Sequence, residues 1–199
     1  MPQENENRGM IPARVTIAEA AIRVIAQQGF DVVSVRTVAQ ESGISPGTVQ
    51  YHYRTRRDLL LAALERSVER QTQRVMAARG QNGYRASLAR TLRELLPLEG
   101  VRREDAAVWV SFGAAASTRD WLASVYWQNL QIFHEGVLNV LRQAQEDGKL
   151  REGLTPDTAA PLVTALVNGL ALDHLNAPES VRASTEQALD RGLSLILTD

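Results

Sequence analysis

Residues 34–53 read SVRTVAQESGISPGTVQYHY, and this stretch decides the fold of the first part of the chain. Ser34 stands where the N-cap of a helix belongs, because its hydroxyl can accept a hydrogen bond from the first turn. Gly43 ends that helix, since glycine adopts the left-handed conformation of a tight turn without strain. Ser45 and Pro46 then begin another helix, with Ser as the N-cap and Pro at the first helical position. Two short helices joined by such a turn predict a helix-turn-helix.

The second helix of this motif is polar and aromatic, unlike a typical core helix. Gln50 carries an amide that can pair with adenine, and Thr48 can donate to phosphate. Val49 and Tyr53 are four residues apart and are predicted to face inward. The alternative is that these helices belong to an all-helical core without a DNA role. The residues expected to contact double-stranded DNA are Ser34, Arg36, Thr37, Ser45, Pro46, Gly47, Thr48, Gln50, Tyr51, His52 and Arg56.

Helical periodicity continues on both sides of this motif, and no convincing alternating strand pattern interrupts it. We expect an all-α fold of about nine helices. A flexible tail over 1–11 precedes an N-terminal three-helix DNA-binding domain over 12–57. A connecting helix over 55–79 leads into a helical ligand-binding and dimerisation domain over 80–199. The turn cluster at 80–83 is the predicted boundary.

The apolar spacing and the helix breaks divide the second domain further. Predicted helices cover 88–96, 105–116, 119–146 and 155–176, and a last helix contains Val181 and Ile196.

The composition is that of an ordinary globular chain, with 199 residues, 44% hydrophobic and 23% charged. Residues 1–79 hold 11 Arg against 8 acidic residues, whereas residues 80–199 hold 11 basic against 15 acidic residues. The first part therefore suits an anionic partner better than the second.

The absence of cysteine excludes disulfides and cysteine-based metal or catalytic sites. With only three His, we expect no metal, and no nucleophile signature points to an enzyme, so neither a catalytic residue nor a cofactor is predicted. The N-terminus lacks the apolar segment of a signal peptide, and no apolar run is long enough to span a membrane. We expect a cytoplasmic protein with no membrane partner.

Residues 14–64 resemble the N-terminal domain of the TetR family of bacterial regulators. The family usually has His-Tyr-Phe where this chain has Tyr51-His52-Tyr53, and Lys where this chain has Arg56. Resemblance in the second domain is to the BetI-like subgroup of that family. The matching stretches are 20–21, 29–30, 34–39, 43–45 and 47–53 in the first domain, and 109–116, 148–150, 156–160 and 166–170 in the second.

The resemblance implies a homodimer in which the last two helices of each subunit form a four-helix interface. It also implies that helices within 88–136 surround an inducer cavity. The expected function is a repressor released from an inverted-repeat operator by a small-molecule effector. Alternatives are a ligand-independent or partner-controlled regulator, and a small-molecule-binding protein without DNA function. The residues expected at the dimer interface are Leu162, Leu166, Leu170, His174, Leu189 and Leu193.

Six of the ten aromatic residues lie within residues 109–133, and a helix there would align several of them on one face. A pocket lined by aromatic rings and a few polar groups suits a small organic ligand. The alternative, an ordinary hydrophobic core, is equally open for the cluster as a whole. The residues expected to bind the ligand are Trp109, Phe112, Trp121, Tyr126, Asn129, Phe133 and Asn168.

Overall fold

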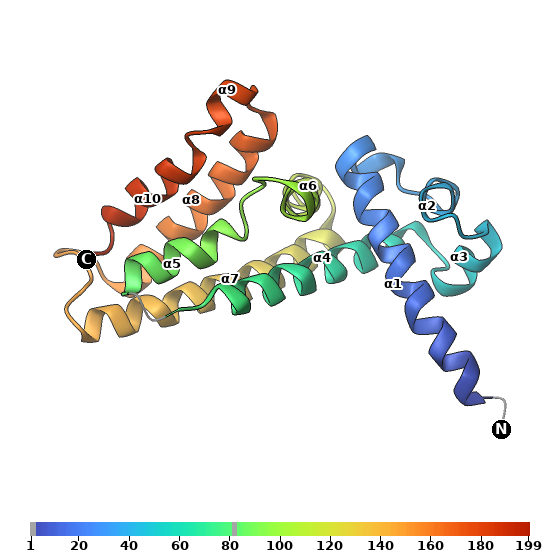
Figure 1. The fold of residues 1–199 in the computed structure, drawn as a ribbon, viewed down its shortest axis with the longest axis horizontal. Coiled ribbons are helices and arrows are strands. Elements are labelled where there is room, and N and C mark those ends of the chain that lie inside the picture. The colour runs from blue at the N-terminus through green and yellow to red at the C-terminus, as the bar shows by residue number, and fades with distance from the viewer. Residues whose placement is uncertain (1–2, 81–82) are drawn as a thin grey trace.

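The computed structural model describes residues 3–80 and 83–199. Within this part of the chain, helices joined by turns and short loops make up the regular secondary structure, apart from an isolated antiparallel bridge between Leu150 and Leu197 (Figure 1). The all-α fold of about nine helices is confirmed. A single turn, α9, precedes α10 where one last helix is predicted. The helices are α1 (Gln3–Gln28), α2 (Val35–Ser42), α3 (Pro46–His52), α4 (Arg56–Ala78), α5 (Tyr84–Arg93), α6 (Gly100–Ala116), α7 (Asp120–Glu146), α8 (Pro156–Asn176), α9 (Glu179–Arg182) and α10 (Thr185–Ser194), with a short 3-10 turn over Phe30–Val32.

The helix starts follow the predicted capping chemistry. Ser34, Thr55 and Thr155 each form a capping box, in which the N-cap side chain and the third helical residue bond each other's backbone N–H groups. Gly43 ends α2 with φ of 69°, in the left-handed region. Pro46 occupies the first turn of α3 behind its N-cap Ser45. These local signals fix where the helix-turn-helix begins and turns.

The N-terminal segment differs from the sequence prediction. Residues 3–11 lie within α1, whereas a flexible tail was expected over 1–11; residues 1–2 lie outside the described residues. Extending an existing helix gains one hydrogen bond for each residue that is fixed, so a polar sequence can continue it. In Figure 1 this part of α1 projects beyond α2 and α3, at the end of the molecule away from α5–α10.

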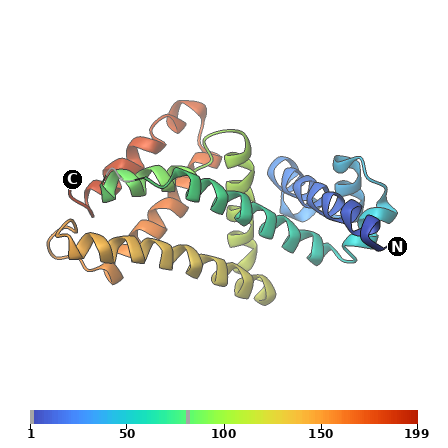
Figure 2. The same ribbon diagram turned by 60° about the horizontal axis from the view of Figure 1, so that its bottom comes forward.

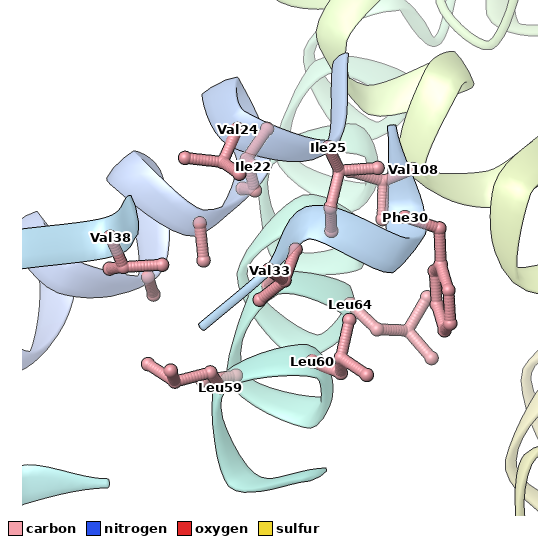
Figure 3. Close-up of a cluster of buried hydrophobic side chains, with 14 of the residues drawn as sticks. Ile22, Val24, Ile25, Phe30, Val33, Val38, Leu59, Leu60, Leu64 and Val108 are labelled. Atoms are coloured by element: carbon pink, nitrogen blue, oxygen red, sulfur yellow. The ribbon is translucent and has the colours of Figure 1, made fainter. Parts of the chain in front are cut away.

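Two hydrophobic cores lie at the two ends of the molecule. The first joins α1, α2, α3 and the start of α4 to the end of α6 and the start of α7. Figure 3 shows Val108 of α6 among side chains of α1 and α4 such as Ile25 and Leu64. Phe112 of α6 is fully buried and meets Phe30 edge to face, with ring centroids 5.2 Å apart. The core of the DNA-binding end therefore extends beyond 12–57 and includes part of the second predicted domain.

The second core lies between α5, α7, α8 and α10 and includes Leu141, Val163 and Leu193. Figures 1 and 2 show α4 running from the N-terminal end towards this second group of helices. Along its length α4 packs against α1, α6 and α5. It is the physical link that the sequence predicts over 55–79, although α6 is a second link beside it.

Candidate DNA interface and effector region

Helix α3 presents one face to solvent and anchors the other in the first core. Val49 is fully buried and Tyr53 is 6% exposed, as predicted. Gly47, Thr48 and Gln50 are exposed, and Tyr51 is 73% exposed. A large, mostly exposed aromatic side chain next to an exposed amide suits a surface that a partner covers.

The first turn of α3 is free of bulky side chains. The Ser45 hydroxyl accepts a hydrogen bond from the Thr48 N–H at 3.1 Å and lies 2.9 Å from the Thr48 hydroxyl. A Cβ added to Gly47 would meet only the Ser45 hydroxyl, at 3.9 Å. The helix can therefore bring its N-terminal turn close to another surface, with its dipole favouring an anion there.

The three predicted DNA contacts at the start of α2 differ in their surroundings. Arg36 is exposed. Thr37 instead donates its hydroxyl to the Val32 carbonyl at 2.9 Å and accepts from the Ser34 N–H at 2.9 Å. Ser34 and Thr37 are thus engaged in starting the helix, and their expected DNA contacts would have to come in addition to these bonds.

Arg56 is expected to contact DNA, and the structure engages part of its guanidinium within the protomer, so a DNA contact would have to come in addition to the bonds made there. Its guanidinium donates to the Val33 and Phe30 carbonyls, both at 2.9 Å, and lies 5.3 Å from the Phe30 ring centroid. These carbonyls lie in the link between α1 and α2, and this link needs partners for its backbone groups. Arg56 therefore fastens the link to the start of α4.

Sequence reasoning missed the contacts by which the corner between α6 and α7 reaches the DNA-binding end. The Arg57 guanidinium lies 4.6 Å from the Trp121 ring centroid, in cation–π contact. Arg119 lies over the Phe30 ring at 5.6 Å and forms an ion pair with Asp31 at 3.5 Å. No local sequence pattern predicts these contacts, because they form only when segments that are distant in the sequence meet in the fold.

A polar and aromatic group joins α6, α7 and α8. The indole N–H of Trp109 donates to the Asn168 side-chain oxygen at 2.9 Å, and its ring lies 4.6 Å from that of Tyr126. Burial raises the pKa of the Tyr126 hydroxyl, which therefore stays protonated and neutral at physiological pH. The Thr164 hydroxyl lies 3.5 Å from Nδ1 of His134. Trp109, Tyr126 and Asn168 form the part of the predicted ligand set that the structure brings together.

The remaining residues of the predicted ligand set lie apart from this group. Phe112 belongs to the first core, against Phe30, and Trp121 contacts Arg57. Phe133 packs on the second core, and the Asn129 amide donates to the Val125 carbonyl of its own helix at 2.9 Å. The single ligand-binding face expected on α7 is divided, because a 27-residue helix passes both cores and its turns meet different neighbours.

Helices α4 and α6 are joined by a buried ionic contact. Asp105 is 1% exposed, and its carboxylate meets Nε of Arg70 at 3.0 Å and Nη1 of Arg74 at 2.9 Å. Arg70 is only 13% exposed, so both partners of this contact lie largely away from solvent. A buried carboxylate requires such partners to offset its lost hydration. The contact therefore fixes the two links between the ends of the molecule to each other.

The predicted dimer residues divide between surface and core. Leu162 is 53% exposed, whereas Leu189 and Leu193 are fully buried within the protomer. His174 is also buried, with Nδ1 2.8 Å from the Thr185 hydroxyl, and Leu166 and Leu170 are partly buried. Leu189, Leu193 and His174 thus contribute to the protomer fold.

The reason is the close packing of α8 against α10. A Cβ at Gly192 would collide with the Leu166 side chain, so the two helices approach at this glycine and cover their facing residues. The other large apolar side chain that α8 exposes besides Leu162 is that of Leu172, at 47%, and Leu195 after α10 is 75% exposed.

Within residues 3–80 and 83–199, no helix is both long and apolar enough to cross a membrane. The same residues contain no cluster of three or more His, Asp or Glu side chains arranged to hold a metal.

The architecture and the exposed α3 define a helix-turn-helix regulator, and comparisons with known proteins give its family. Residues 17–63 match the family described as bacterial regulatory proteins, tetR family, and residues 84–198 match the family described as BetI-type transcriptional repressor, C-terminal. The chain belongs to the TetR family of DNA-binding transcriptional regulators, with a BetI-type C-terminal region.

Similar proteins support this assignment over most of the chain. The HTH-type transcriptional regulator PksA of Bacillus subtilis is 28% identical over 84% of this chain and 81% of its own length. A transcriptional regulator from Rhodococcus sp. Rha1 is 30% identical, with a TM-score of 0.80 over 92% of this chain and 95% of its own. A regulator from Saccharomonospora viridis, solved in complex with choline, is 26% identical, with a TM-score of 0.84 over 94% of this chain and 99% of its own.

Proposed function

We propose that the protein is a homodimeric repressor that binds an inverted-repeat operator through α3 of each subunit and leaves it when a small organic effector binds. The observation that carries the proposal is the exposed polar face of α3 over the buried Val49 and Tyr53. One short recognition helix contacts too few base pairs for useful specificity, and two-fold symmetry doubles the site. Such a protein acts in the cytoplasm, where the DNA of a bacterium lies.

Base contacts are proposed for Ser45, Gly47 and Gln50, and phosphate contacts for Arg36, Thr48, Tyr51 and His52. The Gln50 amide matches the donor and acceptor pattern of adenine in the major groove. Tyr51 and His52 lie edge to face, with ring centroids 5.3 Å apart, so that each restricts the other's position. This division assigns sequence preference to the residues that contact bases and general affinity to the residues that contact phosphates.

The dimer interface is proposed on the outer side of α8, with Leu162 and Leu172 at its centre. Ala165 and Gly169 are exposed between them, and a Cβ added to Gly169 would meet nothing within 4 Å. Small residues between two exposed leucines allow a second helix to pack closely, which a dimer related by a two-fold axis would provide.

The effector is proposed to bind beside Trp109, Tyr126 and Asn168. Trp109 is on α6, whose neighbouring turns carry Asp105, fixed to α4, and Phe112, fixed to Phe30. A ligand that displaces the Trp109 ring would therefore shift α6 and, with it, the separation of the two DNA-binding ends. Because the S. viridis regulator was solved with choline, and aromatic faces attract such cations, choline is the first compound to test.

The decisive experiment measures DNA binding and its response to ligand on one preparation. Fragments from the region around the protein's own gene are titrated at several salt concentrations, and we expect affinity to fall steeply as salt rises. Light scattering should give the mass of a dimer, and an effector should raise the melting temperature while weakening DNA binding. Salt-independent binding, or none to any fragment, would contradict the DNA role. A stable monomer would contradict the dimer.

A further inference from the structure

The middle of α1, at Arg14, lies next to the end of the recognition helix. The Arg14 guanidinium carbon lies 4.8 Å from the Tyr53 ring centroid, and Tyr53 is the C-cap residue of α3. The Tyr53 hydroxyl donates to the Arg14 carbonyl at 3.3 Å. Two different contacts thus connect the same pair of residues, one through the backbone of α1 and one through its side chain.

Arg14 itself remains available to a partner. It is exposed, and none of the ion pairs within the described part of the chain involves it. Stacking uses one face of a guanidinium and leaves the N–H groups along its edge free to donate.

Tyr53 positions Arg14 but cannot itself contact DNA. Its side chain is 6% exposed, so its ring belongs to the first core and cannot reach DNA. Burial raises the pKa of its hydroxyl, which therefore keeps the proton that it donates to Arg14. In Figure 1, the N-terminal part of α1 extends beyond α3.

We infer that Arg14 is a DNA-phosphate contact outside the helix-turn-helix and that Tyr53 is its positioning residue. A recognition helix in a major groove has backbone phosphates on either side of it, and Arg can bind a phosphate through two parallel hydrogen bonds. The inference rests on the proposed placement of α3 in the groove. It adds α1 to the DNA-binding surface of the protein, and it assigns to Tyr53, the C-cap of α3, the positioning of Arg14.

The test compares operator affinity in wild type, Arg14→Ala, Tyr53→Phe and the double variant. Arg14→Ala should weaken binding about tenfold on every operator variant alike and lower the slope of log affinity against log salt by about 1 per subunit. Tyr53→Phe retains the ring and should cost about two- to threefold, because the stacking persists while the tether to α1 is lost. In the double variant the second change should add nothing, since Tyr53 acts on DNA only through Arg14.

Arg142→Ala is the matched control, because it removes the same charge from an exposed position of α7, in the second group of helices. It should leave affinity and salt slope unchanged. If wild type binds its operator with a steep salt slope and Arg14→Ala matches wild type, the inference is wrong while the DNA role stands. If Arg14→Ala changes only the melting temperature, or if the two single effects add fully, the contact is structural and the inference is equally overturned. Failure of wild type to bind any operator would instead refute the proposed function.

Discussion

The recognition helix α3 and the C-terminal pair α8 and α10 differ in how well their surfaces could be predicted. In α3 the sequence predicts Val49 inside and Gln50 outside, and the structure agrees. In α10 it predicts Leu189 and Leu193 at a partner subunit, and both are fully buried within the protomer. The two regions teach that spacing identifies an apolar face but does not identify what the face packs against.

Helix α3 was the easier case because its neighbours are fixed by adjacent sequence. Its cap and the turn before it lie within a few residues, so its orientation on α1 and α2 follows from local chemistry. Helix α8 is apolar on most of its sides, so burial within a protomer and burial between protomers have the same sequence pattern.

Replacing Asp105 should have the largest effect. Asp105→Asn removes the buried charge between Arg70 and Arg74, which then keep only their longer ion pairs with Glu104, at 3.3 Å, and Glu94, at 3.5 Å. The loss should cost about 3 kcal/mol of unfolding free energy. Urea unfolding followed by circular dichroism at fixed protein concentration measures it.

Asp190→Asn is the control for Asp105, because Asp190 forms its ion pair with Arg93 at the surface, where it is 49% exposed. It should cost less than about 1 kcal/mol. Equal effects of the two substitutions would show that the contact between α4 and α6 contributes no more than a surface pair.

Leucines of the C-terminal pair should separate into two classes. Leu193→Ala removes a fully buried side chain and should lower the unfolding free energy by about 3 kcal/mol. Leu162→Ala removes a side chain that is 53% exposed and should cost the isolated protomer less than about 1 kcal/mol. Urea unfolding of each variant is the measurement.

The same two positions test the dimer from the other side. Leu162→Glu should shift the mass found by light scattering towards the monomer while the circular dichroism spectrum stays helical, since a charge buried between subunits is strongly unfavourable. If Leu162→Glu remains a dimer, the interface lies on another face of the protein. The exposed leucines of α8 would then not be the surface that packs against a partner subunit.

What the sequence could not provide is the set of contacts made by distant segments. Capping and turn residues such as Ser45 and Gly43 act over three or four positions, so they could be identified directly. Arg56 is expected to face DNA because its family position and charge suggest it, but nothing in the sequence indicates that its Nε and Nη2 also donate to the Val33 and Phe30 carbonyls. Such a contact depends on where the link between α1 and α2 comes to rest, which no local pattern encodes.

The base-reading role of α3 can be separated from its phosphate contacts. Gln50→Ala should reduce discrimination at one base pair of each half-site by about 1–3 kcal/mol and leave the other positions unchanged. Tyr51→Phe keeps the ring but loses the hydroxyl, and should weaken all operator variants by a similar small factor. Fluorescence anisotropy on a set of single-base operator variants measures both, and identical profiles for the two substitutions would refute the division of roles.

The smallest expected effect concerns His174 of α8, which the sequence analysis expects at the dimer interface. Burial lowers the pKa of its imidazole, and the positive charges of Arg182 and Arg103 lower it further. The unfolded chain, with an ordinary value of about 6.5, therefore binds the proton more readily than the folded protein. Stability should fall as pH decreases below about 6.5, by at most about 1.4 kcal/mol per pH unit from this group.

His174→Gln removes the titrating group and retains a hydrogen-bonding side chain for Thr185, so the difference in unfolding free energy between wild type and variant is the measurement. Between about pH 7.5 and 5.5 this difference should decrease as the pH is lowered, whereas carboxylates titrate equally in both proteins and cancel. If His174 were instead at a solvated subunit surface, its pKa would be ordinary and the two curves would run parallel. A difference in unfolding free energy that changes with pH would therefore support the burial of His174 inside the protomer, where α8 meets α10. This part of α8 would then stabilise the protomer and not a subunit interface.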